Sequence, residues 1–339
     1  MRIGNNPHKK NSLHESNYTH QVIIPVFIPH HEDYFKDSFK IFQLCLNSLF
    51  ITKHNETFIT IVNNGSCDDV KEYLNDLFTN NLIHEVIHTD NVGKFNAVLK
   101  GIVGNHFPLV TISDSDVLFL DNWQNATVEV FNIFSKAGVV GLVPQFRSFG
   151  ENSTNLIFET LFSKKVTFTS LEDIDGIKKF YESLGWDTNY NQDYLKYILT
   201  IEEQNYKAIV GSGHFIATYR RELFDEIKTY SNLKMGPKAL KYIDLLPLKF
   251  NLWRLTTNKN YAYHLGNTYE NWMNYSIDSL AKNSQHRLEF ISNSNQITKE
   301  NRLLYFIKNK FFKKIFNKRK IRKIYYKYKG LSKYVASKY

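Results

Sequence analysis

The chain has 339 residues, of which 42% are apolar and 15% aromatic, so it can bury a substantial core as one large domain or two small ones. Its two cysteines, Cys45 and Cys67, exclude a disulfide framework and a cysteine-rich zinc cluster, which favours a reducing, cytosolic setting. No run reaches the roughly 18 apolar residues of a membrane span, and residues 1–21 lack the apolar core of a signal peptide, so we expect neither.

The net charge of +10 is concentrated at one end of the chain. Residues 299–339 hold 15 lysines and arginines against the single acid Glu300, a charge of +14, which leaves −4 for the rest. A mildly acidic body argues against nucleic-acid binding. The basic residues of the tail are interleaved with Phe, Ile and Tyr, which predicts an amphipathic segment on an anionic membrane surface. A solvated helical extension or a contact between copies is the alternative.

Apolar runs and helical spacings alternate along the first part of the chain. Residues 22–28 and 58–62 are nearly continuous apolar runs, typical of buried parallel strands, and Pro25 is expected to end the first. Residues 34–50 and 70–78 carry apolar side chains at the spacing of amphipathic helices. Two strand–helix units are therefore predicted at the start of the fold.

The alternation continues with a strand at residues 84–88, a helix at 95–102 and a strand at 108–112. A helix at 123–135 and a strand at 138–144 follow. Strands that alternate with helices predict an α/β fold with a doubly wound, mostly parallel sheet and helices on both faces.

The second half of the sequence is less regular. Residues 152–207 are rich in aromatic side chains, and we expect them to be mostly helical. Residues 208–219 combine a glycine-rich turn with an apolar strand, and residues 221–228 fit a helix. Residues 261–265 fit a short strand that ends at His264. These segments are expected to extend the same α/β architecture.

The most informative stretch is the end of the strand at 108–112, where Asp114, Ser115 and Asp116 follow a buried run. Ligands of open α/β sheets bind at the carboxyl ends of the strands. Two close carboxylates repel each other unless a cation lies between them, and Mg²⁺ or Mn²⁺ carrying substrate phosphates uses one or two such ligands. The pattern predicts a metal–diphosphate site; a turn whose aspartates only cap backbone groups is the alternative.

Several segments follow one another in an order that is informative when they are taken together. They are VIIPVF at 22–27, IVNNGSCDD at 61–69, NVGKFNAVLKGI at 91–102, TISDSDVLF at 111–119 and GSGHFIATYRRELF at 211–224. This series resembles glycosyltransferase family 2, whose members have the nucleotide-sugar transferase fold called GT-A. The resemblance extends over residues 22–267 and implies a nucleotide-sugar donor.

The resemblance implies which residues bind the donor. Pro25 and Val26 would line the nucleotide base. Asn63 stands where the family usually has an aspartate that bonds the base; an amide both donates and accepts, so base binding could survive, but the preference for uridine is left open. Lys94, at the start of a helix, would bind the diphosphate. An ordinary solvated lysine is the alternative for Lys94.

The resemblance also implies a metal site for Mn²⁺ or Mg²⁺. Asp114 and Asp116 would be ligands, Asp114 would in addition face the sugar or ribose, and Ser115 between them belongs to the same nucleotide-sugar site. Members of this fold often complete the metal site with a late histidine, which places His264 there. A structural or exposed histidine is the alternative.

The catalytic base is expected to be an acid, because inverting members use Asp or Glu to take the proton from the acceptor hydroxyl. Asp244 has the right order in the chain, and its apolar neighbours would make it a stronger base. An N-cap role is the alternative, with Asp225 and Glu226 as competing candidates. His214 is the rival of His264 and would face the acceptor.

The sequence is expected to divide into a flexible arm at 1–20, a GT-A domain at 21–298 and a basic segment at 299–339. Within the domain, residues 21–120 would bind the nucleotide and residues 121–298 the acceptor. Four aromatic residues could stack on sugar faces, although core positions are the alternative for each: Trp123, Trp186, Tyr219 and Trp253.

The expected function is a metal-dependent hexosyltransferase that moves a sugar from a nucleotide-sugar, a UDP-sugar by resemblance, to a saccharide or lipid-linked acceptor in surface polysaccharide synthesis, with inversion. It would act in the cytoplasm, peripherally on the inner face of the membrane. The alternative is a non-catalytic GT-A-like protein that binds a nucleotide or glycan in a membrane-associated assembly, because the acidic pair typical of the family is not cleanly present.

Overall fold

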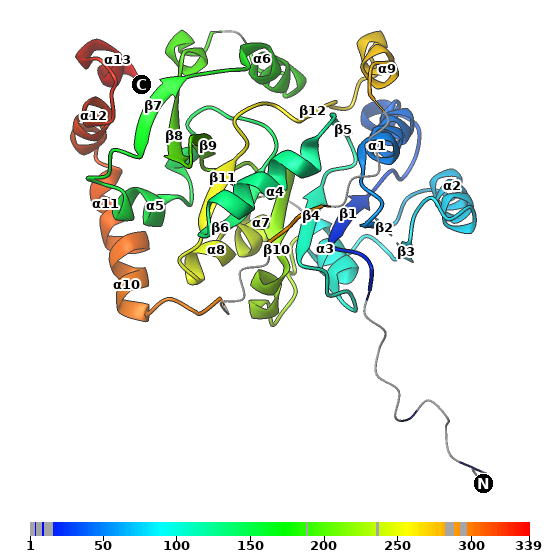
Figure 1. Ribbon diagram of the computed structural model, residues 1–339. Coiled ribbons are helices and arrows are strands. Elements are labelled where there is room, and N and C mark those ends of the chain that lie inside the picture. Colours follow the sequence, from blue (N-terminus) through cyan, green and yellow to red (C-terminus); the bar gives the residue numbers. More distant parts are fainter. Residues whose placement is uncertain are drawn as a thin grey trace.

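The computed structural model describes residues 16–187, 189–234, 237–281, 288–291 and 297–339, together with Gly4 and Lys9. Most of the predicted N-terminal arm therefore lies outside the described residues. A ten-stranded sheet runs through the molecule in the order β3-β2-β1-β4-β10-β6-β11-β9-β8-β7, with helices on both faces (Figure 1). The predicted α/β architecture is confirmed.

The first half of the sheet has four parallel strands joined by helices. The predicted strands and helices of this half are confirmed to within a few residues. They are β1 (His20–Val26), α1 (Ser38–Thr52), β2 (Thr57–Asn63), α2 (Asp68–Thr79), β3 (Glu85–His88), α3 (Lys94–Ile102) and β4 (Leu109–Ser113). Pro25 does not end β1, contrary to expectation. It lies beyond Ile23, the last residue of β1 that pairs with β4, so its missing N–H leaves the ladder with β4 intact.

The second half of the sheet mixes directions. Strand β10 (Ile216–Arg220) is antiparallel to both β4 and β6 (Ala137–Gly141), and β11 (Trp253–Thr256) is parallel to β6. Strands β10, β9 and β7 run opposite to the other seven. The sheet is therefore parallel in most of its strands, and the directions change where the chain leaves the regular alternation.

The mostly helical expectation for residues 152–207 is wrong. This stretch contains α5 (Thr154–Glu159) and α6 (Ile174–Ser183), but also the antiparallel strands β7 (Val166–Ser170) and β8 (Tyr197–Glu203) and the start of β9 (Tyr206–Val210). Strands β8 and β9 form a hairpin whose two-residue turn, Gln204 and Asn205, has positive φ at both positions. Such a turn usually carries Gly, and its absence removed the sequence signal.

A two-stranded sheet and several helices complete the domain body. Strand β5 (Val117–Phe119) follows the two aspartates and pairs antiparallel with β12 (Ala262–His264), the short strand predicted to end at His264. The helix expected at residues 221–228 is a 3-10 helix over residues 221–226. The remaining helices of the body are α4 (Trp123–Ile133), α7 (Pro237–Asp244), α8 (Leu246–Lys249) and α9 (Asn271–Asp278).

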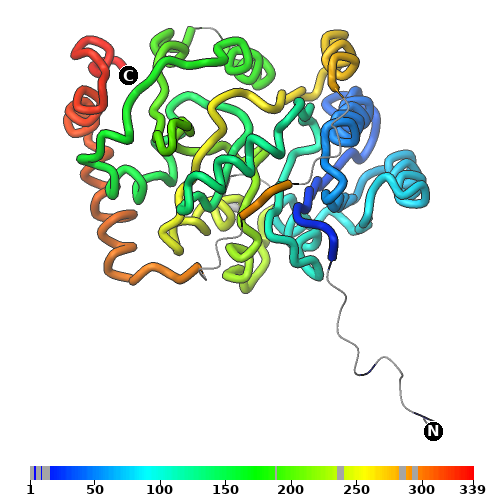
Figure 2. Tube along the Cα trace, viewed as in Figure 1, coloured from blue at the N-terminus to red at the C-terminus, as the bar shows by residue number. Residues whose placement is uncertain are grey.

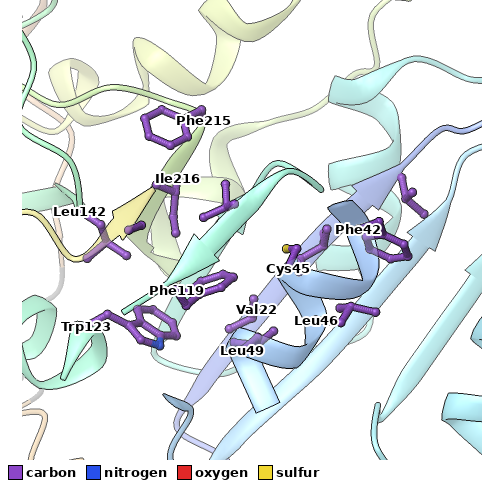
Figure 3. Packing of buried hydrophobic residues seen from close by; sticks show 14 of the residues in the cluster. Val22, Phe42, Cys45, Leu46, Leu49, Phe119, Trp123, Leu142, Phe215 and Ile216 are labelled. Carbon is purple, nitrogen blue, oxygen red and sulfur yellow. The ribbon is translucent and has the colours of Figure 1, made fainter. Parts of the chain in front are cut away.

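The core lies on both faces of the sheet, as alternation along the strands requires. Val22 and Ile24 of β1 face one side, where Phe42, Cys45 and Leu49 of α1 pack against them and against Phe119 and Trp123 (Figure 3). Ile23, between them, faces the other side and belongs to a cluster with α3. The parallel strands are thus buried on both faces, which accounts for their nearly continuous apolar sequence.

The C-terminal segment packs as short helices against the β7 end of the sheet, far from β3 (Figures 1 and 2). These are α10 (Arg302–Phe306), a π-helical turn (Ile307–Phe311), α11 (Phe312–Phe316), α12 (Arg319–Tyr328) and α13 (Lys333–Lys338). Phe316, Tyr325, Tyr326 and Tyr339 are buried in a cluster that includes Phe168 of β7. The Phe168 N–H donates to the Lys329 carbonyl over 2.8 Å, so backbone and side chains both join the helices to the body.

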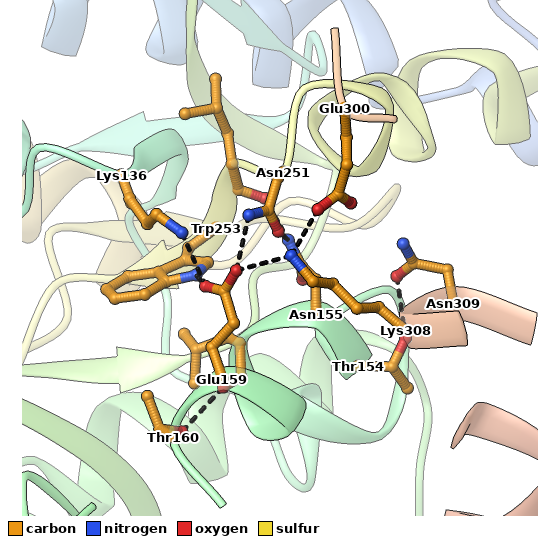
Figure 4. Close-up of polar contacts among 12 residues, drawn as sticks. Lys136, Thr154, Asn155, Glu159, Thr160, Asn251, Trp253, Glu300, Lys308 and Asn309 are labelled. Carbon is orange, nitrogen blue, oxygen red and sulfur yellow. Dashed lines mark hydrogen bonds and ion pairs between the residues drawn. The ribbon is translucent and has the colours of Figure 1, made fainter. Parts of the chain in front are cut away.

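A buried polar cluster fixes the start of this helical segment to α5 (Figure 4). The Glu159 carboxylate accepts hydrogen bonds from Lys136, Asn251, Trp253 and Lys308, and Lys308 also pairs with Glu300. Burial alone would raise the pKa of Glu159, but the bonds from the lysines and Asn251 outweigh it and lower that pKa overall. The carboxylate is therefore held in its charged form, with Lys308 of the C-terminal segment as one of its partners.

Candidate active site

Asp114 and Asp116 lie where β4 leaves the sheet, and their backbones are held by two different strands. The Asp114 N–H donates to the Phe215 carbonyl, just before β10, over 2.8 Å. The Leu265 N–H, just after β12, donates to the Asp116 carbonyl over 2.7 Å. The turn is thus fixed at the carboxyl edge of the sheet, the place where the sequence predicts a ligand site.

His264 meets Asp116 because β12 pairs with β5, which aligns His264 with Val117. The His264 Nε2 lies 3.5 Å from the Asp116 Oδ2. On the other side of the ring, the Ser183 hydroxyl donates to the Phe180 carbonyl over 2.6 Å, so it can only accept from the His264 Nδ1, 3.0 Å away. Ser183 thus orients the ring so that Nε2 faces Asp116, and an outer hydrogen bond to the second ring nitrogen is typical of metal-binding histidines.

Burial governs the charge state of Asp116. Desolvation raises the pKa of this carboxyl above its usual value, and the nearby Asp114 adds to that effect. His264 and Lys94 act in the opposite direction. A divalent cation between Asp116 and His264 would remove the unfavourable charge, so this pair fits an oxygen- and nitrogen-ligated metal such as Mn²⁺ or Mg²⁺.

Asp114 has a different partner, since its carboxylate forms an ion pair with the Lys94 ammonium. Among the described residues, no three acidic, histidine or cysteine side chains lie close enough together to hold a metal ion. The protein donors that do converge are Asp116 and His264, which is a small set. Mg²⁺-type sites commonly take one or two protein carboxylates and complete the shell with substrate phosphates and water. The three-ligand set with Asp114 stays a prediction.

Lys94 is positioned by a turn that only glycine can make. Gly93 has φ +85°, and a Cβ at Gly93 would come within 2.6 Å of the Lys234 carbonyl oxygen. The Asn64 side chain accepts from the Val92 N–H over 2.9 Å, which ties this turn to the end of β2. Helix α3 therefore begins at a fixed point beside Asp114, with Lys94 as its first residue.

A pocket of about 350 Å³, which we call the β1 pocket, lies between β1 and the aspartate turn. Residues from the sequence prediction that line it are Pro25, Val26, Lys94, Asp114, Ser115 and Asp116. The structure thus brings together most of the predicted donor-binding set. Asn63 is buried beside it, with its amide nitrogen 3.0 Å from the His88 Nδ1 and its oxygen accepting from the Ser66 N–H. The adjacent Asn64 lines the β1 pocket, and a base-binding role for Asn63 stays a prediction.

A second pocket, of about 750 Å³, lies on the other side of the aspartate turn and is here called the aromatic pocket. Asp114 lines both pockets, and His264 lines the aromatic one. Its walls carry Phe146, Phe180, Tyr181, Trp186, Tyr194 and Phe215. Phe146 and Tyr181 stack with ring centroids 4.0 Å apart, and Trp186 is 53% exposed at 4.8 Å from Tyr181. The two pockets therefore meet at the predicted metal–diphosphate site.

The predicted base Asp244 ends α7 and lies close to a buried arginine. Its Oδ1 is 3.4 Å from the Arg254 Nη1, and its Oδ2 is 4.0 Å from the His214 Nδ1. His214 is half-exposed and lines the aromatic pocket, and its predicted role of facing the acceptor stays a prediction. Asp244 therefore reaches the pocket through His214, and its role as the base stays a prediction.

The competing acids lie in surface ion pairs. Asp225 pairs with Arg221 over 2.7 Å, and Glu226 pairs with Lys249 and Lys299. Of the four aromatic residues predicted to stack on sugars, Trp123 and Tyr219 are buried in the core. Trp253 belongs to the polar cluster around Glu159, to which its Nε1 donates. Trp186 is the candidate that lines the aromatic pocket. The stacking expectation is wrong for Trp123 and Tyr219.

Sequence reasoning missed the basic groups of the aromatic pocket. Arg147 follows β6, and Arg322 comes from α12, yet both line this pocket. Residues 299–339 are rich in basic and aromatic residues, but this composition does not predict that Arg322 would line the aromatic pocket. The contact depends on the folded position of α12 against the β7 end of the sheet.

The sequence pattern of Glycosyl transferase family 2 matches residues 26–228, which is more than half of the chain. The chain belongs to this family. Membership confirms the resemblance drawn from the five segments between residues 22 and 224, and together with the doubly wound sheet it confirms the GT-A fold. No curated protein sequence matches the chain.

Several solved structures resemble the chain at low identity and with TM-scores below 0.5. The mannosyltransferase PcManGT from Pyrobaculum calidifontis, in complex with GDP-Man and Mn²⁺, is 13% identical with a TM-score of 0.41, over 73% of this chain and 58% of that one. S. aureus TarS 1-349 in complex with UDP-GlcNAc is 14% identical with a TM-score of 0.43, over 79% and 68%. GalNAc-T7 with UDP, GalNAc and Mn²⁺ is 14% identical with a TM-score of 0.46, over 73% and 44%. The chain thus spans less than two thirds of the length of the first and the last.

Proposed function

We propose that this family member is a metal-dependent hexosyltransferase that moves a sugar, with inversion, from a UDP-sugar to a saccharide or lipid-linked acceptor in surface polysaccharide synthesis. The observation that carries the proposal is the meeting of two pockets at Asp114, beside the Asp116–His264 pair. A transferase needs two substrates in contact at one point. The β1 pocket would hold the donor and the aromatic pocket the acceptor.

The donor side offers groups suited to a diphosphate. Asp116 and His264 would hold Mn²⁺ or Mg²⁺, which would offset the negative charge that develops on the leaving diphosphate. Lys94 would add a second positive charge at the start of α3, where it now pairs with Asp114. Pro25 and Val26, which line the same β1 pocket, would contact the base.

The transfer itself is a single displacement at the anomeric carbon. The acceptor hydroxyl loses its proton to a protein base while its oxygen forms the new bond to that carbon. The bond from the anomeric carbon to the diphosphate oxygen breaks, and its electron pair leaves with the diphosphate. In the proposed displacement, the acceptor hydroxyl would attack from the side opposite the leaving diphosphate, and the configuration would be inverted.

The base is proposed to be Asp244 acting through His214. His214 lines the aromatic pocket, and its Nδ1 faces Asp244 at 4.0 Å, so the opposite nitrogen would take the proton while the carboxylate stabilises the charged ring. One observation favours the non-catalytic alternative instead. The Asp244 carboxylate already pairs with the buried Arg254, so part of it is engaged within the protein and does not face an acceptor.

Replacement of Asp116 tests the proposal. Asp116→Asn should weaken metal-dependent UDP-sugar binding by about 100-fold or more, because loss of an outer-shell partner alone commonly costs 10–100-fold. Thermal shift and donor hydrolysis with UDP-, GDP- and CMP-sugars, with Mn²⁺, Mg²⁺ or EDTA, give the readout. Asp76→Asn, the same change on the exposed face of α2, is the matched control.

Three results separate the possible functions. Metal-dependent binding of one nucleotide that is lost in the Asp116 variant and kept in the Asp76 variant supports the proposal and identifies the base. Unchanged binding in the Asp116 variant would overturn the metal role. Binding without hydrolysis or transfer to any offered sugar would favour the glycan- or nucleotide-binding alternative.

We also propose that the outer face of the C-terminal helices lies on an anionic membrane surface on the cytoplasmic side. Exposed apolar side chains, among them Leu303, Phe306 and Ile324, stand among exposed lysines there. Within the described residues, no helix is long and apolar enough to cross a membrane. Co-sedimentation with phosphatidylserine vesicles tests this proposal, and equal recovery with neutral vesicles would contradict it.

A further inference from the structure

Two arginines from distant parts of the chain reach the aromatic pocket. Arg147 lies in the loop after β6, and Arg322 lies on α12, 175 positions later. Neither guanidinium has a carboxylate within ion-pair distance among the described residues, whereas Arg221 and Arg254 both do. Two acids share the lining with them: Asp114, whose carboxylate pairs with Lys94, and the exposed Glu151. Because Asp114 is already paired with Lys94, the two guanidinium groups outnumber the one acid that remains on the lining.

The backbone and side chain of Arg147 are both constrained by their surroundings. Its backbone has φ +52°, a left-handed conformation that is costly for a non-glycine residue and is kept only when the surroundings enforce it. The loop that holds it is pressed against Gly211, where a Cβ would come within 2.3 Å of the Ser148 carbonyl group. Its Nη1 donates to the Tyr194 hydroxyl over 3.4 Å, and its Nε is buried with no hydrogen-bond partner among the described residues.

Arg322 is placed by the buried side of α12. Tyr325 and Tyr326, one turn further along, are in the core, so the helix cannot rotate freely about its axis. Burial raises the pKa of Tyr326, and the positive charges of both Arg147 and Arg322 partly oppose this rise. The two guanidinium groups are thus near the same phenol, and both residues line the aromatic pocket.

The lining of the aromatic pocket combines the two arginines with Asp114 and His264 of the predicted metal–diphosphate site. Asp114 lines both pockets, His264 lines the aromatic pocket, and aromatic side chains make up much of the rest of its lining. Aromatic rings stack on the apolar faces of sugars, and arginine binds phosphate or carboxylate oxygens through paired N–H groups. A neutral sugar would leave both guanidinium groups without an anionic partner.

We infer that the acceptor is an anionic saccharide, whose phosphate or carboxylate group is bound by Arg147 and Arg322 while its sugar ring stacks in the aromatic pocket. This inference rests on the proposed function, since it takes the aromatic pocket as the acceptor site. It gives the C-terminal segment a second role, because α12 contributes directly to acceptor recognition. Arg147 and Arg322 are specificity-determining residues in this account.

Matched sugars test the inference on the full chain with saturating UDP and Mn²⁺. Glucose, glucose 6-phosphate and glucuronic acid differ mainly in charge, and their binding is measured by calorimetry and ligand-observed NMR. At least one charged sugar should bind about tenfold more tightly than glucose, as expected for hydrogen bonds to a charged group. The phosphate and carboxylate arms show which anion the pocket takes.

Arginine variants show whether the preference comes from this pocket. Arg322→Gln should reduce binding of the charged sugar about tenfold, toward that of glucose. Arg319→Gln removes the same charge from an exposed position of α12 and should leave binding unchanged. If Arg322→Gln fails to fold, as seen by circular dichroism, Arg147→Gln and the charge-preserving Arg322→Lys take its place. Arg322→Lys should retain part of the preference.

The outcomes separate this inference from the proposed function. Equal binding of charged and neutral sugars, no binding of either charged sugar, or an unchanged preference in the arginine variants would overturn the inference while metal-dependent UDP binding stands. Loss of metal-dependent UDP binding in the wild-type protein, with charge-selective sugar binding intact, would overturn the proposed function and leave an anionic glycan site.

Discussion

His20 is a buried ionisable residue at the beginning of β1. Its Nδ1 accepts from the Gln124 amide over 2.8 Å, so its Nε2 carries the proton and donates to the Thr111 hydroxyl over 2.6 Å. Burial, with a further contribution from His54, lowers the pKa of His20 from 6.5 to about 3. Near pH 6.5, where the His20 ring of the unfolded chain begins to take up a proton, the ring in the folded protein therefore stays neutral.

Stability should consequently fall with acid before the carboxylates titrate. The folded pKa lies below the unfolded value of 6.5, so the contribution of His20 is complete above pH 6.5 and is lost as the pH falls toward about 3. His84 and His88 have lowered pKa values from burial and add in the same direction. Between pH 6.5 and 5.0, His20 alone should remove about 2 kcal/mol from the free energy of unfolding.

Urea unfolding across this pH range measures the effect. His20→Gln keeps a donor and an acceptor near Gln124 and Thr111, and it should make the dependence on pH shallower. His106→Gln, at an exposed position, is the control and should retain the wild-type slope. An identical slope in all three proteins would show that His20 does not drive the acid sensitivity.

At the scale of elements, the site depends on how β12 and α3 meet the end of β4. The β12–β5 pairing brings His264 to Asp116 from 148 positions away, and the Gly93 turn sets the first residue of α3 beside Asp114. Each contact is made by a short element with little freedom to shift. A change of backbone at Gly93 should therefore act on the donor side without touching any group that binds the donor.

Gly93→Ala tests this dependence. The new Cβ would meet the Lys234 carbonyl oxygen at 2.6 Å in a left-handed conformation, which should cost about 2–4 kcal/mol of stability and weaken UDP binding. Gly104→Ala is the matched control, since Gly104 has φ +90° but a Cβ there would meet no described atom within 4 Å. It should cost about 1 kcal/mol and leave UDP binding unchanged. Similar losses of UDP binding in both variants would contradict the role of the turn.

At the scale of the whole molecule, the C-terminal segment has two faces. One face is joined to the body by buried tyrosines and by Lys308, whose burial would lower its pKa but whose partners Glu159 and Glu300 raise it overall. The other face carries exposed basic and apolar side chains. The segment is therefore part of the packed structure, and its position determines whether Arg322 reaches the aromatic pocket.

Lys308→Met should destabilise the protein strongly. It leaves Glu159 short of one partner and Glu300 without its ammonium, and breaking a buried ion pair commonly costs about 3–5 kcal/mol. Lys299→Met removes a 63% exposed lysine that pairs with Glu226 and should cost less than about 1 kcal/mol. Chemical denaturation compares the two, and equal small losses would mean that Glu159 and Glu300 are satisfied without Lys308.

The sequence alone determined the α/β alternation, the family and the aspartate turn at the end of β4. These features are local: a buried parallel strand reads as an apolar run, a helix as a 3.6-residue period, and the residues at a strand end follow directly in the chain. His264 could be placed after its short strand for the same reason. The β8–β9 hairpin was missed because its turn, Gln204 and Asn205, lacks the usual glycine.

Only the tertiary structure decided which of these residues meet. No local sequence pattern connects the residues that pair in the site, which are Lys94 with Asp114 and Asp244 with Arg254. The same holds for Arg147 and Arg322, which line one pocket. The amphipathic pattern of the tail predicts an apolar face. The same pattern is expected whether that face contacts a membrane or the body of the protein. Long-range packing settles the choice for the buried tyrosines, because their contacts with Phe149 and Phe168 exist only once the sheet has formed.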